Sequence, residues 1–77
     1  MEIKYYSAPW CAPCKQMWPR IQRFAESHGI PVDKIDISET DVEGILSVPT
    51  IDVIVNGDVE LRCTDARVAI RHMEGAL

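Results

Sequence analysis

The spacing of apolar residues along the chain predicts alternating strands and helices. Over residues 2 to 6, Ile3 and Tyr5 alternate with Glu2 and Lys4, a period of two that is typical of a short strand. The Ser-Ala-Pro-Trp run that follows breaks this alternation. A helix is therefore expected to begin after that run.

From Cys14 onward, the apolar residues lie three or four positions apart, which is the spacing of one buried stripe on a helix. These residues are Met17, Trp18, Ile21, Phe24 and Ala25. Gly29 and Pro31 then supply the signals that end a helix. Pro19 lies inside this segment, where proline removes one backbone hydrogen bond and costs about 3 kcal/mol in a regular helix, so we expect a kink.

Residues 32–37 are predicted to form a second strand. Because a helix joins it to the first strand, a right-handed crossover and parallel pairing are expected. Ser38 is predicted to cap a second helix, with acidic residues in its first turn and Gly44 keeping it short. The apolar residues of this predicted helix are Val42, Ile45 and Leu46.

Residues 50–55 are rich in β-branched side chains and are joined to residues 58–62 by Asn56-Gly57, the strongest short hairpin signal in a sequence. Thr64 or Asp65 is expected to cap a last helix. Its apolar face would consist of Ala66, Ala69, Ile70 and Met73. The predicted order is βαβαββα in one α/β domain, residues 1–77, without repeats or linkers.

Composition narrows the classes of protein to which the chain can belong. Apolar residues make up 47% of the 77 residues and charged residues 26%, which is typical of a folded globular domain. The net charge of −4 argues against nucleic acid or anionic lipid as partners, because both require clustered basic residues. No apolar run approaches the roughly 18 residues of a membrane span, and the N-terminus lacks the plan of a signal peptide. We therefore expect a cytoplasmic monomer.

The chain has three cysteines, which are too few and too odd in number for a secreted disulfide framework. In a reducing compartment, a close pair more often serves catalysis or metal binding than structure. Cys11 and Cys14 lie three positions apart at the expected helix start, so they can close a disulfide. Such a small ring contributes only about 2 kcal/mol to stability. The pair therefore suits a redox switch better than a structural staple.

The two cysteines are predicted to have different roles. An ordinary thiol, with a pKa near 8.5, is only about 3% ionised at pH 7, so the nucleophile needs help. A helix dipole contributes about 0.3 to 1 kcal/mol, which is too little alone. Only Cys11, ahead of the helix, can also accept hydrogen bonds from the first-turn amides and the partner thiol. We therefore predict that Cys11 attacks and that Cys14, aligned with the apolar stripe, resolves the mixed disulfide.

Two neighbouring residues are candidate parts of the same site. Pro13 preorganises the helix start and stiffens the ring between the cysteines. Trp10 offers a flat apolar surface beside the attacking sulfur, which would suit a polypeptide substrate.

Three separated features resemble the thioredoxin family: the run Trp10-Cys11-Ala12-Pro13-Cys14-Lys15, Pro19 five residues further on, and Val48-Pro49-Thr50 before the hairpin. The resemblance implies a minimal thioredoxin fold, a mixed four-stranded sheet with helices on both faces. It also implies reduction of protein disulfides, with the Cys11–Cys14 disulfide as the redox centre, no further cofactor, and thioredoxin reductase as electron donor. A cis peptide before Pro49 would place that residue, with Val48, in the substrate groove.

The sequence departs from the family at two points. Thioredoxins usually carry a buried aspartate six residues before the first cysteine, and this chain has Tyr5 there. The chain is also as short as a glutaredoxin, and Ser47-Val48-Pro49 and Cys63-Thr64-Asp65 resemble the segments that hold glutathione in that family. Glutaredoxins usually have a basic residue just before the first cysteine, and this chain has none.

Two alternatives therefore stay open. One is a glutathione-dependent glutaredoxin. The other is a binding module without catalysis, which would use the groove around Trp10 and Pro49 while its cysteines stay idle or hold zinc. The only other soft ligands are Cys63, His28 and His72, so we expect no metal site.

Several residues have simpler structural interpretations. Cys63 alternates in phase with Val59 and Leu61 and is interpreted as a small buried residue, and both histidines are interpreted as surface residues. Lys15 is expected to be exposed and Asp65 to cap a helix. Asp52 could accept the proton of Cys14, but strand alternation favours a position on the less covered face of the sheet.

Overall fold

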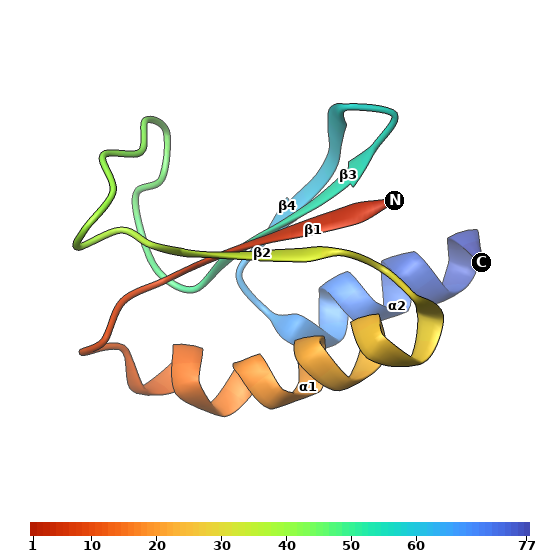
Figure 1. Ribbon diagram of the computed structural model, residues 1–77, viewed down its shortest axis with the longest axis horizontal. Coiled ribbons are helices and arrows are strands. Elements are labelled where there is room, and N and C mark those ends of the chain that lie inside the picture. Colours follow the sequence, from red (N-terminus) through yellow and green to blue (C-terminus); the bar gives the residue numbers. More distant parts are fainter.

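The computed structural model describes residues 1–77 and forms one mixed sheet with two helices (Figure 1). The elements in chain order are β1 (Glu2–Ser7), α1 (Ala12–His28), β2 (Val32–Asp36), β3 (Thr50–Val55), β4 (Asp58–Cys63) and α2 (Ala66–Ala76). The strand order in the sheet is β2-β1-β3-β4. β1 pairs parallel with β2 and antiparallel with β3, and β3 pairs antiparallel with β4. The predicted crossover and hairpin are both present.

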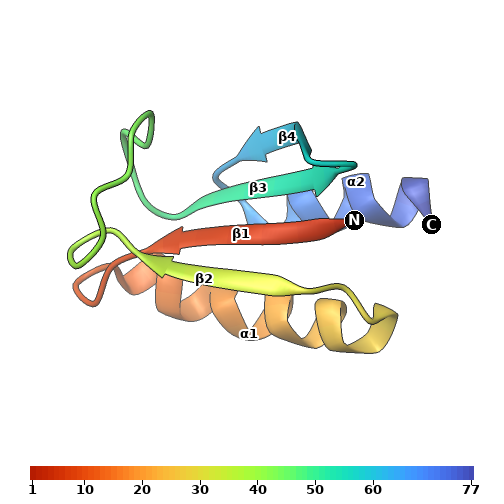
Figure 2. The same cartoon turned by 45° about the horizontal axis from the view of Figure 1, so that its top comes forward.

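Both helices cover the same face of the sheet (Figure 2). Alternate strand residues point toward them, and these residues form the buried core with one side of each helix. The strands contribute Ile3, Tyr5, Ile51 and Val53, and the helices contribute Cys14, Ile21, Ala25, Ala66, Ala69 and Met73. The prediction of helices on both faces is wrong, because the helix expected from Ser38 does not form. Neither helix is long and apolar enough to cross a membrane.

The segment between β2 and β3 forms turns instead of a helix. Ser38 donates its backbone N–H and its hydroxyl to Oδ1 of Asp36, at 2.9 and 2.6 Å, and these contacts close a turn after β2. Gly44 has a positive φ of 81°, which interrupts any regular helix. Leu46 is 98% exposed, so the predicted apolar face packs against nothing. Such a short helix without tertiary packing is not stable in water.

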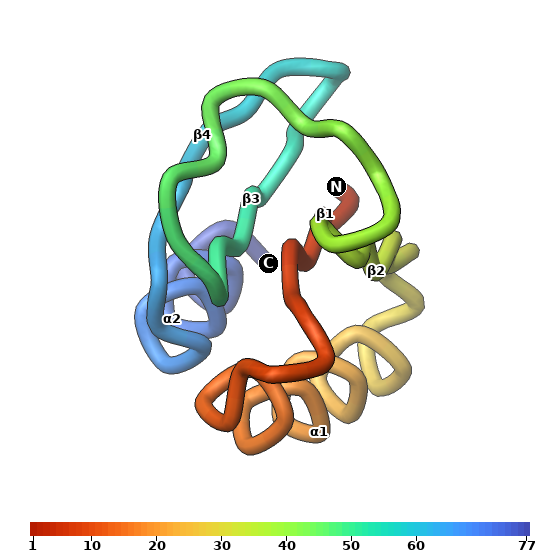
Figure 3. The backbone as a smooth tube through the Cα atoms, turned by 90° about the vertical axis from the view of Figure 1, so that its left-hand side faces the viewer, coloured from red at the N-terminus to blue at the C-terminus, as the bar shows by residue number.

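The same segment arches from β2 to β3 beyond one end of the sheet, on the side away from the helices (Figures 1 and 3). There the Arg62 guanidinium covers the Asp52 carboxylate in a bidentate pair, with N···O distances of 2.7 and 2.8 Å. Asp52 is only 1% exposed. A Cβ added at Gly44 would lie 3.7 Å from Nη1 of Arg62, which places the connecting segment beside the guanidinium of this ion pair.

Local signals explain the ends of α1. Its cap residue is Cys11, whose extended backbone and side chain begin the helix, with Pro13 in the first turn. The helix continues through Pro19. Gly29 ends it in the left-handed conformation, with φ of 65°, which glycine adopts without steric cost.

Candidate redox site

Cys11 and Cys14 form a disulfide at the start of α1, with their Cα atoms 5.3 Å apart. Cys11 is the N-cap residue, and its Sγ accepts a hydrogen bond from the backbone N–H of Cys14 at 3.2 Å. Both side chains are buried, Cys14 at 2% exposure and Cys11 at 5%. A first-turn amide therefore points at the sulfur of Cys11, which is the arrangement that favours a thiolate at this position.

Trp10, Val48 and Pro49 lie at the same end of the sheet as the disulfide. Tyr6 near the end of β1 pairs with Thr50 at the start of β3. The segment after β1, which holds Trp10, and the segment before β3, which holds Val48 and Pro49, therefore lie at the same end of the sheet. The indole of Trp10 is 72% exposed, whereas Pro49 is buried and Val48 is partly buried against the core. The peptide bond between Val48 and Pro49 is cis, as the resemblance implies.

Tyr5 lies directly beneath the redox pair. Its hydroxyl donates a hydrogen bond to the backbone carbonyl oxygen of Cys14 at 2.7 Å, and its ring packs on Trp18 with centroids 5.2 Å apart. Tyr5 is fully buried, and this burial raises its pKa to about 12. The phenol is therefore a neutral hydrogen-bond donor where the family usually has a carboxylate. The sequence identified the substitution but gave no signal for this contact.

A cavity of about 510 Å³ opens beside Cys14. Its polar walls come from α1 and from the helix-facing side of β2, and they include Lys15, Lys34 and Asp36. The ammonium of Lys34 lies 4.7 Å from the ring centroid of Trp18, a cation–π contact that holds the side chain at the cavity wall. No sequence motif marks Lys34 or Asp36 as part of this site, because only strand pairing brings them to Cys14.

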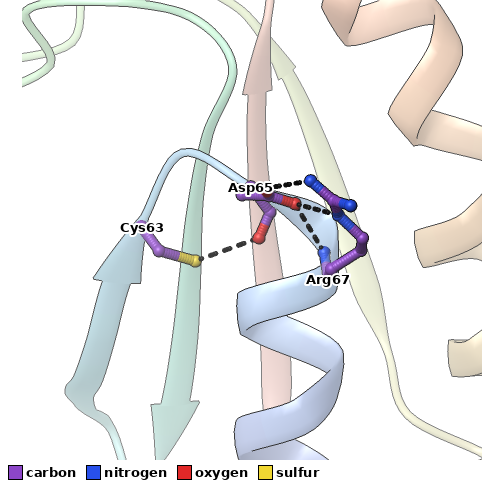
Figure 4. Close-up of polar contacts among 3 residues, drawn as sticks. All are labelled: Cys63, Asp65 and Arg67. Carbon is purple, nitrogen blue, oxygen red and sulfur yellow. Dashed lines mark hydrogen bonds and ion pairs between the residues drawn. The ribbon is translucent and has the colours of Figure 1, made fainter.

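The segment Cys63-Thr64-Asp65 runs from the last residue of β4 to the N-cap of α2 (Figure 4). Asp65 accepts the backbone N–H of Arg67 at 2.8 Å and pairs with its guanidinium at 3.2 Å, and these contacts lower the pKa of Asp65. The thiol of Cys63 donates to the Asp65 carbonyl at 3.6 Å, and burial raises its pKa. The predicted capping role of Asp65 is confirmed, whereas Cys63, which was expected to be buried, is only partly buried. A smaller cavity of about 220 Å³, lined by Arg20, Asp65 and Arg67, lies between α1 and the start of α2.

The remaining candidates lie away from the disulfide. Asp52 is on the opposite face of the sheet, as strand alternation indicated, so it does not face Cys14. His28 bonds the carbonyl of Phe24 at 3.0 Å, and His72 pairs with Glu60 at 2.7 Å. No three His, Cys, Asp or Glu side chains are grouped so that they could hold a metal ion.

Comparison with known proteins places these features in a family. The thioredoxin family model matches residues 2–73. Thioredoxin from Alicyclobacillus acidocaldarius is 38% identical over 56 residues, which cover 65% of this chain and 53% of that protein. Thioredoxin from Bacillus subtilis is 34% identical over 58 residues, 68% of this chain and 56% of that protein. Mouse mitochondrial thioredoxin is 40% identical over 60 residues, 70% of this chain and 36% of that protein. The matches thus span about half or less of each relative.

Solved structures extend the likeness over the whole chain. Thioredoxin 1 from Thermosipho africanus has a TM-score of 0.92 at 25% identity, covering 99% of this chain and 93% of that one. Thioredoxin O1 from Arabidopsis thaliana in its oxidized state shares the fold, with a TM-score of 0.82 at 23% identity and coverage of 99% and 76%. The predicted minimal fold is therefore confirmed, apart from the missing middle helix.

Proposed function

Because this chain belongs to the thioredoxin family, we propose that it reduces protein disulfides through the Cys11–Cys14 pair. The observation that carries the proposal is the cap of α1, where Sγ of Cys11 accepts the N–H of Cys14 while the two sulfurs form a disulfide. This arrangement can hold Cys11 as a thiolate when the pair is reduced and can close again after each exchange.

The reaction would proceed in two exchange steps. The Cys11 thiolate attacks one sulfur of a substrate disulfide, and the other substrate sulfur leaves as a thiolate. Cys14, once deprotonated, attacks Sγ of Cys11, so that the intramolecular disulfide forms and the bond to the substrate breaks. Two electrons pass from the dithiol to the substrate. An external dithiol must then reduce the Cys11–Cys14 disulfide.

Trp10, Pro13, Val48 and Pro49 are the proposed substrate-contacting residues. The exposed indole of Trp10 supports this assignment, because a large apolar side chain in solvent beside a reactive sulfur is suited to contact a polypeptide. Val48 and Pro49 lie at the same end of the sheet as Trp10 and would form the opposite side of the groove. We propose that residues 1–77 act as one domain and as a monomer, in the cytoplasm, with thioredoxin reductase as electron donor.

The test is NADPH-coupled reduction of a protein disulfide by catalytic amounts of the chain. One arm contains thioredoxin reductase and the other contains glutathione with its reductase. Cys11→Ser should abolish turnover, whereas Cys63→Ser is the matched control and should leave it unchanged, because Cys63 ends β4 and takes no part in the disulfide. Absence of turnover in both arms, with folded protein and free thiols, would contradict the proposal.

Glutathione dependence is a second candidate, because the smaller cavity at the start of α2 brings two guanidinium groups, Arg20 and Arg67, beside the segment that resembles a glutathione site. Turnover only in the glutathione arm would favour it. Stoichiometric zinc after purification, with thiols protected from alkylation, would instead favour the binding module.

A further inference from the structure

The resolving step requires Cys14 to lose a proton in a buried setting, because its side chain is only 2% exposed. Tyr5 of β1 contacts Cys14, and its hydroxyl donates to the carbonyl oxygen of Cys14. That hydroxyl stays protonated at neutral pH because burial raises the pKa of Tyr5 to about 12. Tyr5 therefore cannot take the proton, and another group is required.

The cavity beside Cys14 contains a single carboxylate. The charged side chains that line it are Lys15 from α1 and Lys34 and Asp36 from β2. The lysine ammonium groups are donors only, so Asp36 is the one charged group there that can accept a proton. A volume of about 510 Å³ has room for several waters, since each occupies about 30 Å³ in the liquid, and the polar walls supply hydrogen-bond partners.

The side chain of Asp36 is oriented toward this cavity by β2 and by the turn that follows β2. It pairs with Ser7 in the parallel register, on the same face of the sheet as Lys34 and Tyr5. Its Oδ1 accepts both the backbone N–H and the hydroxyl of Ser38, which hold the carboxylate in one orientation. Every other carboxylate of β1, β2 and β3 lies off the cavity wall, including Asp52, which faces the opposite side under Arg62.

We propose that Asp36 accepts the Cys14 proton through water in this cavity during the resolving step. The proton leaves Sγ of Cys14, a water passes a proton to the Asp36 carboxylate, and the Cys14 thiolate attacks Sγ of Cys11. The bond between Cys11 and the substrate sulfur breaks, and that sulfur leaves with the electron pair. Asp36 then passes this proton to solvent, and Cys14 takes up a proton through the cavity water when the disulfide is reduced again. This proposal rests on the proposed exchange function.

A charge effect and a proton-transfer effect of Asp36 have opposite signs. If Asp36 acted only through its negative charge, removing it would favour the Cys14 thiolate and speed the resolving step. If Asp36 acts as proton acceptor, its removal slows that step. The groups that face Cys14 across the cavity, Lys15 and Lys34, are unchanged in either case.

The experiment resolves the two exchange steps by stopped flow. The reduced chain is mixed with a nitrobenzoate disulfide that releases one coloured thiolate when Cys11 attacks and a second when Cys14 displaces the mixed disulfide. Asp36→Asn keeps an oxygen for the contacts with Ser38 but cannot accept the proton. Asp36→Glu keeps the carboxylate. Asp33→Asn is the matched control, since Asp33 lies on the opposite face of β2, paired with Lys4.

We expect Asp36→Asn to leave the first phase unchanged and to slow the second about tenfold or more at neutral pH, since general base catalysis is typically worth a factor of ~10² to 10⁴ when direct. The second phase of this variant should rise with hydroxide concentration and recover when formate is added. Asp36→Glu should retain most of the rate, and Asp33→Asn all of it. A second phase that is unchanged or faster in Asp36→Asn would overturn the proposal. Loss of both phases in the unaltered chain would instead contradict the exchange function itself.

Discussion

The hydroxyl of Tyr5 and the backbone carbonyl of Cys14 are joined by a buried hydrogen bond of 2.7 Å. This bond links the central strand of the sheet to the first turn of α1, where the disulfide lies. A carboxylate at this position could exchange a proton with Cys14. A phenol that keeps its proton can only fix the backbone, so positioning and proton transfer are separated in this chain.

Tyr5→Phe should lower the free energy of unfolding by about 1 kcal/mol, because the variant leaves the Cys14 carbonyl without the hydroxyl donor while keeping the ring that packs on Trp18. Urea denaturation of the oxidised protein measures this change. Tyr6→Phe is the control, because Tyr6 points to the other face of β1 and no buried hydrogen bond is lost. Equal effects of the two substitutions would contradict the assigned role.

Tyr5 should also make the free energy of unfolding depend on pH in the alkaline range. Burial raises its pKa from 10.0 to about 12, so between these values the unfolded chain releases a proton that the folded chain retains. The contribution is fully present below pH 10 and is lost as pH rises toward 12. The difference in unfolding free energy between the unaltered protein and Tyr5→Phe should therefore shrink over this window. A difference in unfolding free energy that stays constant between pH 10 and 12 would show that burial does not raise the pKa of Tyr5.

Cys14→Ser should trap substrates on the chain. This variant retains the attacking thiol but lacks the resolving one, so mixed disulfides through Cys11 should accumulate and survive non-reducing electrophoresis. Cys11→Ser should trap none. If both variants captured partners equally, the assignment of the two roles would be wrong.

The buried ion pair should respond unequally to loss of its two members. Arg62→Met leaves the carboxylate of Asp52, 1% exposed, without a partner, whereas Asp52→Asn leaves the Arg62 side chain, 46% exposed, in contact with water. We expect Arg62→Met to cost about 1 to 3 kcal/mol, less than the ~3 to 5 typical of a fully buried pair, and Asp52→Asn to cost less. Thermal unfolding of both variants and of the double variant measures this. The double variant should be more stable than Arg62→Met alone.

Two glycines should respond to alanine in opposite directions. Gly29 ends α1 with φ of 65°, and an added Cβ would touch nothing, so the cost of about 1 kcal/mol would arise from the backbone alone. Gly75 lies inside α2, where Gly75→Ala should raise stability by at most about 1 kcal/mol. Chemical denaturation of both variants decides whether the left-handed end of α1 is required.

The sequence pattern predicted both helices, all four strands and the redox pair because these depend on local signals. Apolar spacing placed the buried stripe of α1, and the Asn56-Gly57 turn placed the hairpin. The middle helix was predicted from a capping serine and three apolar residues. That prediction failed because Gly44 has a positive φ within the segment and because Leu46 has no surface to pack against.

The sequence pattern could not predict which residues surround Cys14. Lys34 and Asp36 lie 20 and 22 residues from Cys14 along the chain, and only the parallel register of β1 and β2 brings them to its cavity. The ion pair of Asp52 and Arg62 likewise depends on the register across β3 and β4. Strand alternation gave the correct face for Asp52, but it could not identify the residue opposite.

The position of β1 in the sheet has a consequence for how the chain matures on the ribosome. β1 is made first but lies in the interior of the sheet, between β2 and β3. The nascent chain can pair β1 with β2 through α1, yet the other edge of β1 stays open until β3 emerges. α2, which supplies Ala66, Ala69 and Met73 to the core, follows last. Native packing around the disulfide is thus completed only when synthesis has passed the final helix.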